Sequence, residues 1–370
     1  MATVEYVIPD GLYTRLKIDN HIASGVSKIL LTHNVNSSRY LTVQFSGEEM
    51  AERCHLGAIV EFEYHRGIPN ATAFKDDKKF IGIIKSIAPT DSSVAFTAFD
   101  YTTFLAQSQH VLYKRQDYVG EDLYYAAALA ATYKGIDTST LLQGTGIKIT
   151  EDMDLFGWKT RKEFIDACFN ELRYVVNDTA HPTNTVLQWN YAIREGKTMD
   201  FYLPDPQSNG AIPAITVSYD NNNIIAEGLV SKIDTSKIVN SITVASNSDE
   251  TKYVQLEDND SIQKYGVLST FISYASTSTS TLSNVAYEVL NRFSKPSYTY
   301  NVSLDNADYL DLGDMIALDV PALEKEVIKP VVGYQLEFAE GIKTRYTIGQ
   351  RELTISEYID LLSKPTEVET

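Results

Sequence analysis

The sequence predicts an α+β fold dominated by β-strands, and two observations support this prediction. The 370 residues include 24 Tyr and 14 Phe but only 2 Trp. Tyr and Phe favour strands because a pleated, half-buried surface accommodates their rings. Long stretches at both ends of the chain alternate apolar and polar residues with the period of two that strands require, whereas helical spacing occurs mainly in the middle. We therefore expect a β-dominated chain with a mixed α/β middle region.

Composition narrows the class of protein. Hydrophobic residues at 44% and charged residues at 22% are typical of a folded protein. The net charge of −17 opposes adhesion to phosphate backbones, so we expect no specific nucleic-acid binding. Two cysteines provide neither a disulfide framework nor a thiolate metal cluster. No apolar run reaches about 18 residues and the N-terminus does not resemble a secretion signal, so we expect no membrane segment.

The first hundred residues alternate as strands separated by turn residues. The last two strands form the clearest hairpin, with Pro89, Asp91 and Ser92 supplying the turn. This segment predicts a small β-barrel or sandwich. The predicted strands are Tyr13–Ile18, Lys28–His33, Tyr40–Phe45, Ala58–Tyr64, Lys79–Ile87 and Val94–Asp100.

The middle of the chain contains two predicted helices, at about 120–133 and 160–174. The first has an apolar face of Leu123, Ala126, Ala127 and Ala130. The second begins with a capping box, Thr160 and Glu163, and buries Phe164, Cys168 and Leu172. Strands follow. Ser, Thr and Asn then crowd residues 273–284, which favours a loop or connector before a short helix that ends near Pro296.

The residues after Pro296 alternate as strands again. The last two strands form a hairpin in which Gln335 and Glu337 face Lys343 and Arg345. A second capping box, Thr354 with Glu357, predicts a terminal helix and a polar tail over 354–370.

The two ends of the chain resemble each other. Near the N-terminus, Leu56-Gly57 precedes a strand, and Gly82 lies in the next strand. Near the C-terminus, Leu312-Gly313 precedes a strand, and Gly333 lies in the next strand. Each block contains a turn glycine, a strand, a loop and a long hairpin whose first strand carries a glycine. The chain is therefore predicted to begin and end with copies of one β-domain.

The order of these segments resembles the tail hub proteins of long-tailed bacteriophages, which include the T-even baseplate hub and the hub portion of type VI secretion spike proteins. The resemblance covers most of the chain and depends on short motifs. These are the hairpin FIGIIKSIAPTDSSVAFTAFD, the segment Asp260-Ser261-Ile262-Gln263-Lys264-Tyr265-Gly266 and the segment Leu310-Asp311-Leu312-Gly313-Asp314.

This resemblance implies two tail-tube-like β-barrels at the chain ends, over 1–107 and 296–353, with middle α+β domains over 108–295. It also implies a homotrimer whose two barrels per subunit form a pseudo-sixfold ring, joining a hexameric tail tube or distal tail protein to a threefold spike, fibre or tail-tip protein. Such a protein would be assembled in the host cytoplasm, reside in the virion and let DNA pass. No oligonucleotide-fold spike extension or lysozyme-like insertion is visible in the sequence.

The sequence offers no enzymatic motif, so we expect no enzyme, no cofactor, and no catalytic or metal-ligating residue. H-E-x-x-H, G-x-S-x-G, G-x-x-x-x-G-K and C-x-x-C do not occur. Cys54 and His55 are neighbours, and side chains of successive strand residues point to opposite faces, which disfavours a dyad. Cys168 is predicted to be a buried small hydrophobe. The recurring aspartates favour a solvated loop over a weak metal site; they are Asp305, Asp308, Asp311 and Asp314.

Several interpretations remain open at this point. The acidic surplus is either a solvated surface or the lining of a channel that repels DNA. Four of the tyrosines and both tryptophans are expected to pack in the core and in interfaces rather than to form a glycan-stacking surface. A tail-associated cell-wall hydrolase and a carbohydrate-binding host-recognition protein are the alternative functions. The aromatic residues are Tyr118, Tyr124, Tyr125, Tyr133, Trp158 and Trp189.

Overall fold

The computed structural model of the chain is dominated by strands, which confirms the predicted fold class. It divides into unit 1, Met1–Leu229 with Val302–Ile348, and unit 2, Val230–Asn301 with Gly349–Thr370. The residues that the structure describes are 6–8, 12–46, 53–66, 79–89, 93–108, 111–113, 118–141, 147–151, 153, 155, 157–171, 173–176, 185–202, 215–218, 224–249, 251–305, 310–319, 327–339, 341–349, 355 and 359.

The N-terminal strands form an antiparallel sheet with the order β2-β6-β7-β8-β5-β4. In β8 every second residue is buried, so one face of the strand packs inward as its alternation predicts. All six predicted strands are confirmed, although residues 90–92 of the predicted turn lie outside the described residues. The strands are β1 (Tyr6–Ile8), β2 (Leu12–Ile18), β3 (His21–Ile22), β4 (Val26–Asn34), β5 (Tyr40–Ser46), β6 (Ile59–Arg66), β7 (Lys79–Pro89) and β8 (Ser93–Asp100).

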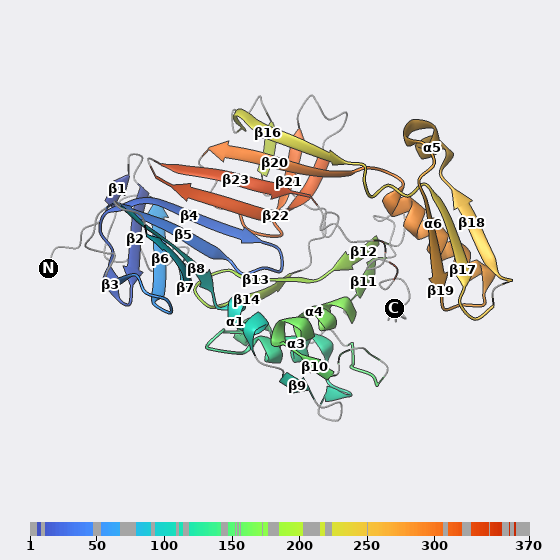
Figure 1. Cartoon of the computed structure of the whole chain (residues 1–370), viewed down its shortest axis with the longest axis horizontal. Coiled ribbons are helices and arrows are strands. Elements are labelled where there is room, and N and C mark those ends of the chain that lie inside the picture. The colour runs from blue at the N-terminus through green and yellow to red at the C-terminus, as the bar shows by residue number, and fades with distance from the viewer. Residues whose placement is uncertain are drawn as a thin grey trace. The chain divides into compact units, whose positions relative to one another are not determined.

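A second set of strands has the order β15-β21-β22-β23-β20-β16, and β22 also pairs with β4, so both sets belong to one sheet (Figure 1). In the final hairpin Gln335 lies opposite Arg345 and Glu337 opposite Lys343, as predicted. The Glu337 carboxylate also forms an ion pair with Lys28 of β4 at 3.0 Å. The strands are β15 (Ile215–Ser218), β16 (Ile224–Asp234), β20 (Ser297–Asp305), β21 (Met315–Asp319), β22 (Val327–Phe338) and β23 (Ile342–Ile348).

The two strand sets share one topology. In chain order, β2, β4, β5, β6, β7 and β8 occupy the same places in the first set as β15, β16, β20, β21, β22 and β23 occupy in the second. One pairing differs, because β15 runs parallel to β21 whereas β2 runs antiparallel to β6. The shared order supports an internal duplication. We refer to the two sets below as the first and second copies.

The turn before β6 has a defined backbone geometry. Gly57 has a φ of +89°, a left-handed conformation that favours glycine. Its amide donates to the Ile84 carbonyl oxygen at 2.9 Å, and the Ile84 amide donates to the Ala58 carbonyl oxygen at 3.0 Å. These two bonds attach the turn to the edge of β7.

The turn before β21 repeats this geometry. Gly313 also has a φ of +89°. Its amide donates to the Val331 carbonyl oxygen at 2.9 Å, and the Val331 amide donates to the Asp314 carbonyl oxygen at 2.9 Å. Ile84 of β7 and Val331 of β22 are therefore equivalent positions in the two copies.

A bulge follows each of these equivalent positions. The register of β7 against β8 shifts between Ile84 and Ser86, and the register of β22 against β23 shifts between Val331 and Gly333. Ser86 is therefore the counterpart of Gly333. The predicted correspondence of Gly82 with Gly333 is wrong, because Gly82 precedes the bulge and Gly333 follows it. Closure into barrels and the boundaries 1–107 and 296–353 stay predictions.

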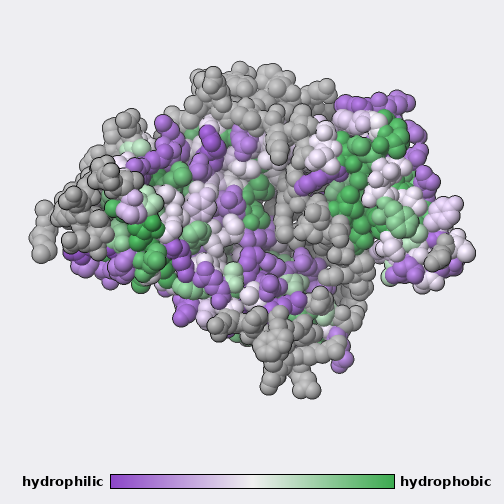
Figure 2. Space-filling model, in the orientation of Figure 1, coloured by the Kyte–Doolittle hydropathy of each residue, from purple (hydrophilic) through white to green (hydrophobic). Residues whose placement is uncertain are grey.

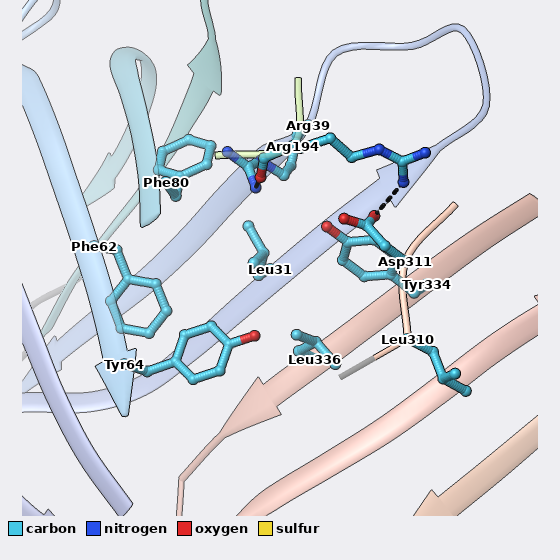
Figure 3. Close-up of a pocket in the computed structure, with 10 residues that line it drawn as sticks. All are labelled: Leu31, Arg39, Phe62, Tyr64, Phe80, Arg194, Leu310, Asp311, Tyr334 and Leu336. Carbon is cyan, nitrogen blue, oxygen red and sulfur yellow. Dashed lines mark hydrogen bonds and ion pairs between the residues drawn. The ribbon is translucent and has the colours of Figure 1, made fainter. Parts of the chain in front are cut away.

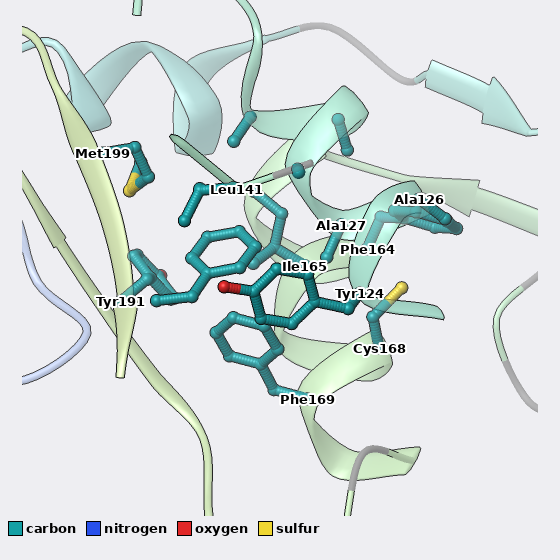
Figure 4. Packing of buried hydrophobic residues seen from close by; sticks show 14 of the residues in the cluster. Tyr124, Ala126, Ala127, Leu141, Phe164, Ile165, Cys168, Phe169, Tyr191 and Met199 are labelled. Carbon is teal, nitrogen blue, oxygen red and sulfur yellow. The ribbon is translucent and has the colours of Figure 1, made fainter. Parts of the chain in front are cut away.

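The segment between the copies packs helices against a short hairpin (Figure 4). The predicted helices are confirmed with narrower bounds: Asp122 caps α3 through the amides of Tyr124 and Tyr125, and Thr160 and Glu163 form the predicted capping box before α4. Leu172 lies outside the described residues. The elements are α1 (Thr102–Gln107), β9 (Val111–Tyr113), α3 (Leu123–Ala131), a 3₁₀ turn (Ser139–Leu141), β10 (Gly157–Lys159), α4 (Arg161–Glu171), β11 (Arg173–Val176), β12 (Thr185–Gln188), β13 (Asn190–Ile193) and β14 (Met199–Tyr202).

Unit 2 packs helix α6 on a three-stranded sheet of order β18-β17-β19. The predicted loop over 273–284 is wrong at both ends: residues 273–274 belong to β19, and from residue 279 onward the Ser/Thr run forms the first turn of α6, which Ser278 caps. Ile355 and Ile359 are helical and pack on this core, while the rest of the predicted terminal helix lies outside the described residues. The elements are β17 (Ser241–Ser246), β18 (Tyr253–Glu257), α5 (Asn259–Tyr265), β19 (Ser269–Tyr274) and α6 (Thr279–Phe293).

The equivalent glycines provide a matched test of the duplicated turn. Replacing Gly57 or Gly313 with Ala strains the backbone similarly, by about 1–2 kcal/mol. A Cβ atom at Gly313 would lie 2.6 Å from Cδ2 of Tyr202, whereas a Cβ atom at Gly57 would meet nothing within 4 Å. We expect Gly313→Ala to lower the free energy of unfolding by about 1–3 kcal/mol more than Gly57→Ala, as measured by urea denaturation. Equal losses would contradict the difference in environment between the two turns.

Candidate functional site

The candidate site is the junction where the two copies meet. Residues 29–34 of β4 lie opposite residues 333–338 of β22 in an antiparallel register. The Val35 amide donates to the Val332 carbonyl oxygen at 3.0 Å, which extends the ladder to the bulge of β22. A strand from the start of the chain thus completes the edge of a strand from its end.

A small pocket lies beside this pairing, between the two copies and the β13–β14 hairpin. Figure 3 shows Phe80 beside the two arginines and Tyr334 beside Asp311, with the other side chains from β4, β6 and β22 lying away from these charged groups. The lining residues are Leu31, Arg39, Phe62, Tyr64, Phe80, Arg194, Leu310, Asp311, Tyr334 and Leu336.

Arg39 links the first copy to the β13–β14 hairpin. Its guanidinium donates from Nη1 to the Arg194 carbonyl oxygen at 2.9 Å and lies over the Phe80 ring at 5.4 Å from the centroid. Its backbone amide donates to Asp100 Oδ2 at 3.0 Å. Arg39 is only 3% exposed, so these contacts replace water around a buried charge.

Arg194 links that hairpin to the second copy. Nε lies 3.0 Å from Asp200 Oδ2. Nη1 lies 3.2 Å from Asp311 Oδ1 (Figure 3). The guanidinium also lies over the Tyr202 ring, 4.6 Å from its centroid. Burial is the largest single influence and opposes the charge, but Asp311 and Asp200 together raise the pKa of Arg194. We call Arg39, Arg194 and Asp311 the junction clasp.

Asp100 lies at the end of β8, behind Arg39. Its carboxylate accepts hydrogen bonds from the Thr102 amide at 3.1 Å and the Thr102 hydroxyl at 2.5 Å, besides that from the Arg39 amide. Burial raises the pKa of Asp100 to about 6, although the Arg39 charge and these hydrogen bonds act in the opposite direction.

His33 lies in β4 at the junction and is fully buried. Its ring meets that of Tyr334 edge-on, with centroids 5.6 Å apart. Among the described residues, no group meets the geometric limits of a hydrogen bond to either ring nitrogen. Burial, followed by the charges of Arg39 and Arg194, holds the pKa of His33 well below its usual value, and a contact with the Ser37 backbone opposes this only in part.

These groups hold segments together. Asp311, the carboxylate of the pocket lining, is fixed by Arg194, and both arginines are engaged by partners from other segments. A charge that is buried and paired favours one arrangement of the segments around it, because any other arrangement leaves it without a partner. The clasp therefore fixes the two copies and the hairpin in one register.

The two cysteines, Cys54 and Cys168, lie apart from this pocket. Cys54 is buried, and its neighbour His55 is exposed with Nε2 3.0 Å from Asp19 Oδ2. Cys168 is fully buried in the helical core, as predicted, and burial raises the pKa of its thiol. No structural observation tests the prediction that the chain lacks catalytic residues.

The aspartate run behaves differently from the predicted solvated loop. Asp311 forms an ion pair with Arg194, so the expectation is wrong for this residue, whereas Asp314 is half-buried in the same turn and its Oδ2 accepts a hydrogen bond from the Asp311 amide at 2.7 Å. Asp308 lies outside the described residues. Within the described ranges, no group of three or more His, Cys, Asp or Glu side chains could hold a metal ion.

Core packing of the aromatic residues is confirmed for several of them. Tyr124 meets Trp189 and Phe201 edge-on, and Tyr118 packs near Phe164. Tyr133 lies beneath Arg161, whereas Tyr125 is 38% exposed. The side chain of Trp158 lies outside the described residues. In the described part of the chain, no helix is long and apolar enough to cross a membrane.

Sequence reasoning did not identify Arg39 or Arg194 as members of a site. Both are single arginines beside short strands, far apart in the chain, and no motif surrounds them. Asp311 belongs to an aspartate run and to the segment Leu310–Asp314, and neither pattern predicts an arginine partner. Its ion-pair partner, Arg194, lies far away in the sequence, so the spacing of residues around Asp311 could not indicate the pair.

Comparisons with known proteins identify the fold. No family model matches the sequence, and no curated protein matches it. Among solved structures, the tail protein from Neisseria meningitidis MC58 superimposes with a TM-score of 0.62 at 11% identity, covering 96% of this chain and 100% of that chain. The 43 kDa tail protein of prophage MuSo2 from Shewanella oneidensis superimposes with a TM-score of 0.61 at 10% identity, covering 96% and 99%.

A third similar structure is the Francisella PdpA-VgrG complex, with a TM-score of 0.50 at 10% identity over 93% of this chain and 53% of that chain. Identities this low show a shared fold and leave function to be argued separately. At the level of fold, the predicted resemblance to phage tail proteins is confirmed.

The junction clasp can be tested by removing one charge. Arg194→Met keeps most of the aliphatic stem but leaves Asp200 and Asp311 without their cation. We expect the free energy of unfolding to fall by about 1–3 kcal/mol. The matched control is Lys162→Met, which removes a half-exposed helix pair with Asp166 and should cost about 0.5 kcal/mol or less. A loss no greater than that of the control would refute the clasp.

Asp100 predicts a pH dependence of stability. Its pKa is about 6 in the folded chain, whereas the usual carboxyl pKa is about 3.9. This pKa shift corresponds to a free-energy difference of about 3 kcal/mol. The stabilisation from the protonated form is complete below about pH 4 and is lost as pH rises through 6. Asp100→Asn cannot titrate. The unfolding free energy of the wild type, measured relative to this variant, should therefore decline by up to about 3 kcal/mol from pH 4 to pH 7. A difference that is constant with pH would exclude this assignment.

Proposed function

We propose that this chain is a structural hub of a phage tail tip or baseplate, in which three copies form a pseudo-sixfold ring. The observation that carries the proposal is the duplicated strand order, repeated down to the glycine turn and the bulge, in a chain with the fold of tail proteins. The tail proteins of Neisseria meningitidis and of prophage MuSo2 support the structural role.

Symmetry gives the duplication its function. Three chains with two related copies each supply six similar modules arranged about a threefold axis. Such a ring can contact a sixfold tube on one side and a threefold spike, fibre or tail-tip protein on the other. The proposed partners are therefore a second and third copy of this chain, a tail tube or distal tail protein, and a tail-tip component.

In this role the protein resides in the virion, and DNA passes through the ring. A net charge of −17 suits this task, since an acidic wall does not retain a phosphate backbone. The proposal assigns no catalytic role to the chain. Its mechanism is geometric: clasped copies present fixed surfaces to the neighbouring rings.

Mass measurement in solution tests the ring directly. We expect the full chain to show the mass of a trimer by light scattering at micromolar concentration, and ring-shaped particles by negative-stain microscopy. A monodisperse monomer under these conditions would overturn the proposed function. Clear lysis of a cell-wall substrate by the purified chain would instead favour the hydrolase alternative.

A further inference from the structure

The two copies differ at one edge of the sheet. In the second copy, β21 pairs with β22 up to Pro330, and β4 then covers the same edge from Gly333 onward. In the first copy, β6 pairs with β7 up to Ile83, and no strand among the described residues covers that edge beyond Ile84. Ser86 of β7 is exposed where its counterpart Gly333 is buried.

The glycine turns differ in the same way. Leu56 is 66% exposed, whereas its counterpart Leu312 is fully buried. Gly57 has open space around it, whereas Gly313 lies against the Tyr202 ring. Because the Gly57 amide bonds to the Ile84 carbonyl oxygen, the exposed turn lies directly beside the uncovered edge of β7.

Further apolar side chains surround this turn. Ile22 and Ile59 are 39% and 43% exposed, and the backbone amide of Asp19, in the turn between β2 and β3, donates to the Ile59 carbonyl oxygen at 2.9 Å. Figure 2 shows hydrophobic surface in green over this end of the first sheet, where β2, β3 and β6 lie in Figure 1. Apolar surface beside an unpaired strand edge is typical of an interface.

The duplication identifies the strand that would cover this edge. In the second copy the edge of β22 is covered by β4, and the counterpart of β4 is β16. β16 ends the strand order of the sheet and pairs with β20 alone among the described strands. Each chain therefore contains one complete junction, between β4 and β22. It also carries the two strands of a second junction, β16 and β7, which do not pair with each other within the part of the chain that the structure describes.

We propose that the edge of β7 beyond Ile84 pairs with β16 of a second copy of this chain, and that this contact buries Leu56. The inference rests on the proposed function and specifies its subunit contact. The junction within each chain and the junction between chains then alternate around the ring. Pro89 has no amide hydrogen, so the ladder would end before it, at about Ala88.

A charge at the turn tests the contact. We expect Leu56→Asp to shift the full chain from trimer to monomer by light scattering, with at least a tenfold loss in assembly at micromolar concentration. Leu129→Asp is the matched control, because Leu129 is 46% exposed on α3, away from the turn, and should leave the trimer intact. Both variants should keep the far-ultraviolet circular dichroism of the wild type. Equal effects of the two variants would overturn the contact.

Cross-linking identifies the partner strand without depending on a destabilised variant. A benzophenone amino acid at position 56 of the full chain should give intermolecular cross-links to peptides within 224–240. Hydrogen exchange of the Ile87 amide, the counterpart of the Tyr334 amide that faces β4, should slow at least tenfold between dilute monomer and assembled protein. A trimer that cross-links elsewhere, or that leaves this amide unprotected, would refute this contact and keep the ring. A chain that never assembles would refute the proposed function itself.

Discussion

The pairing of β4 with β22 is the contact on which the rest of unit 1 depends. A strand edge left in water is a site for unwanted association, and each copy carries such an edge beyond its glycine turn. The chain covers one of these edges with a strand from its own beginning. Because the two strands are remote in sequence, ordering the intervening chain costs conformational entropy, and the ladder between residues 29–34 and 333–338 must be supported by contacts around it.

The clasp supplies part of this support. Arg39 and Arg194 are charged groups in a largely apolar setting, which is unfavourable unless each has partners in place. Arg194 bonds carboxylates on either side of it, and Arg39 bonds the backbone of Arg194. The first copy, the β13–β14 hairpin and the second copy are thereby joined in a fixed order. Sliding any one of them would leave a buried charge unpaired.

Duplication followed by divergence explains the pattern of burial. The glycine turns keep the same φ and the same pair of backbone hydrogen bonds, because that geometry is needed to attach each turn to its strand. Their surroundings have diverged. Gly313 lies against Tyr202, whereas the turn at Gly57 stays open. A chain that satisfies one copy internally and leaves the other open is suited to repeating the same contact with its neighbours.

The sequence by itself determined local structure and the repeat. Alternation located the six N-terminal strands, the capping box at Thr160 located α4, and the paired Leu-Gly turns indicated the duplication, because each of these signals depends on neighbouring residues. It misplaced the start of α6, where tertiary packing of the helix outweighed its Ser/Thr-rich first turn. Only the tertiary structure showed the junction of β4 with β22, the clasp and the corrected equivalence of Ser86 with Gly333. These depend on which strands meet across the sheet, and strand pairing between remote segments leaves no fixed spacing in the sequence.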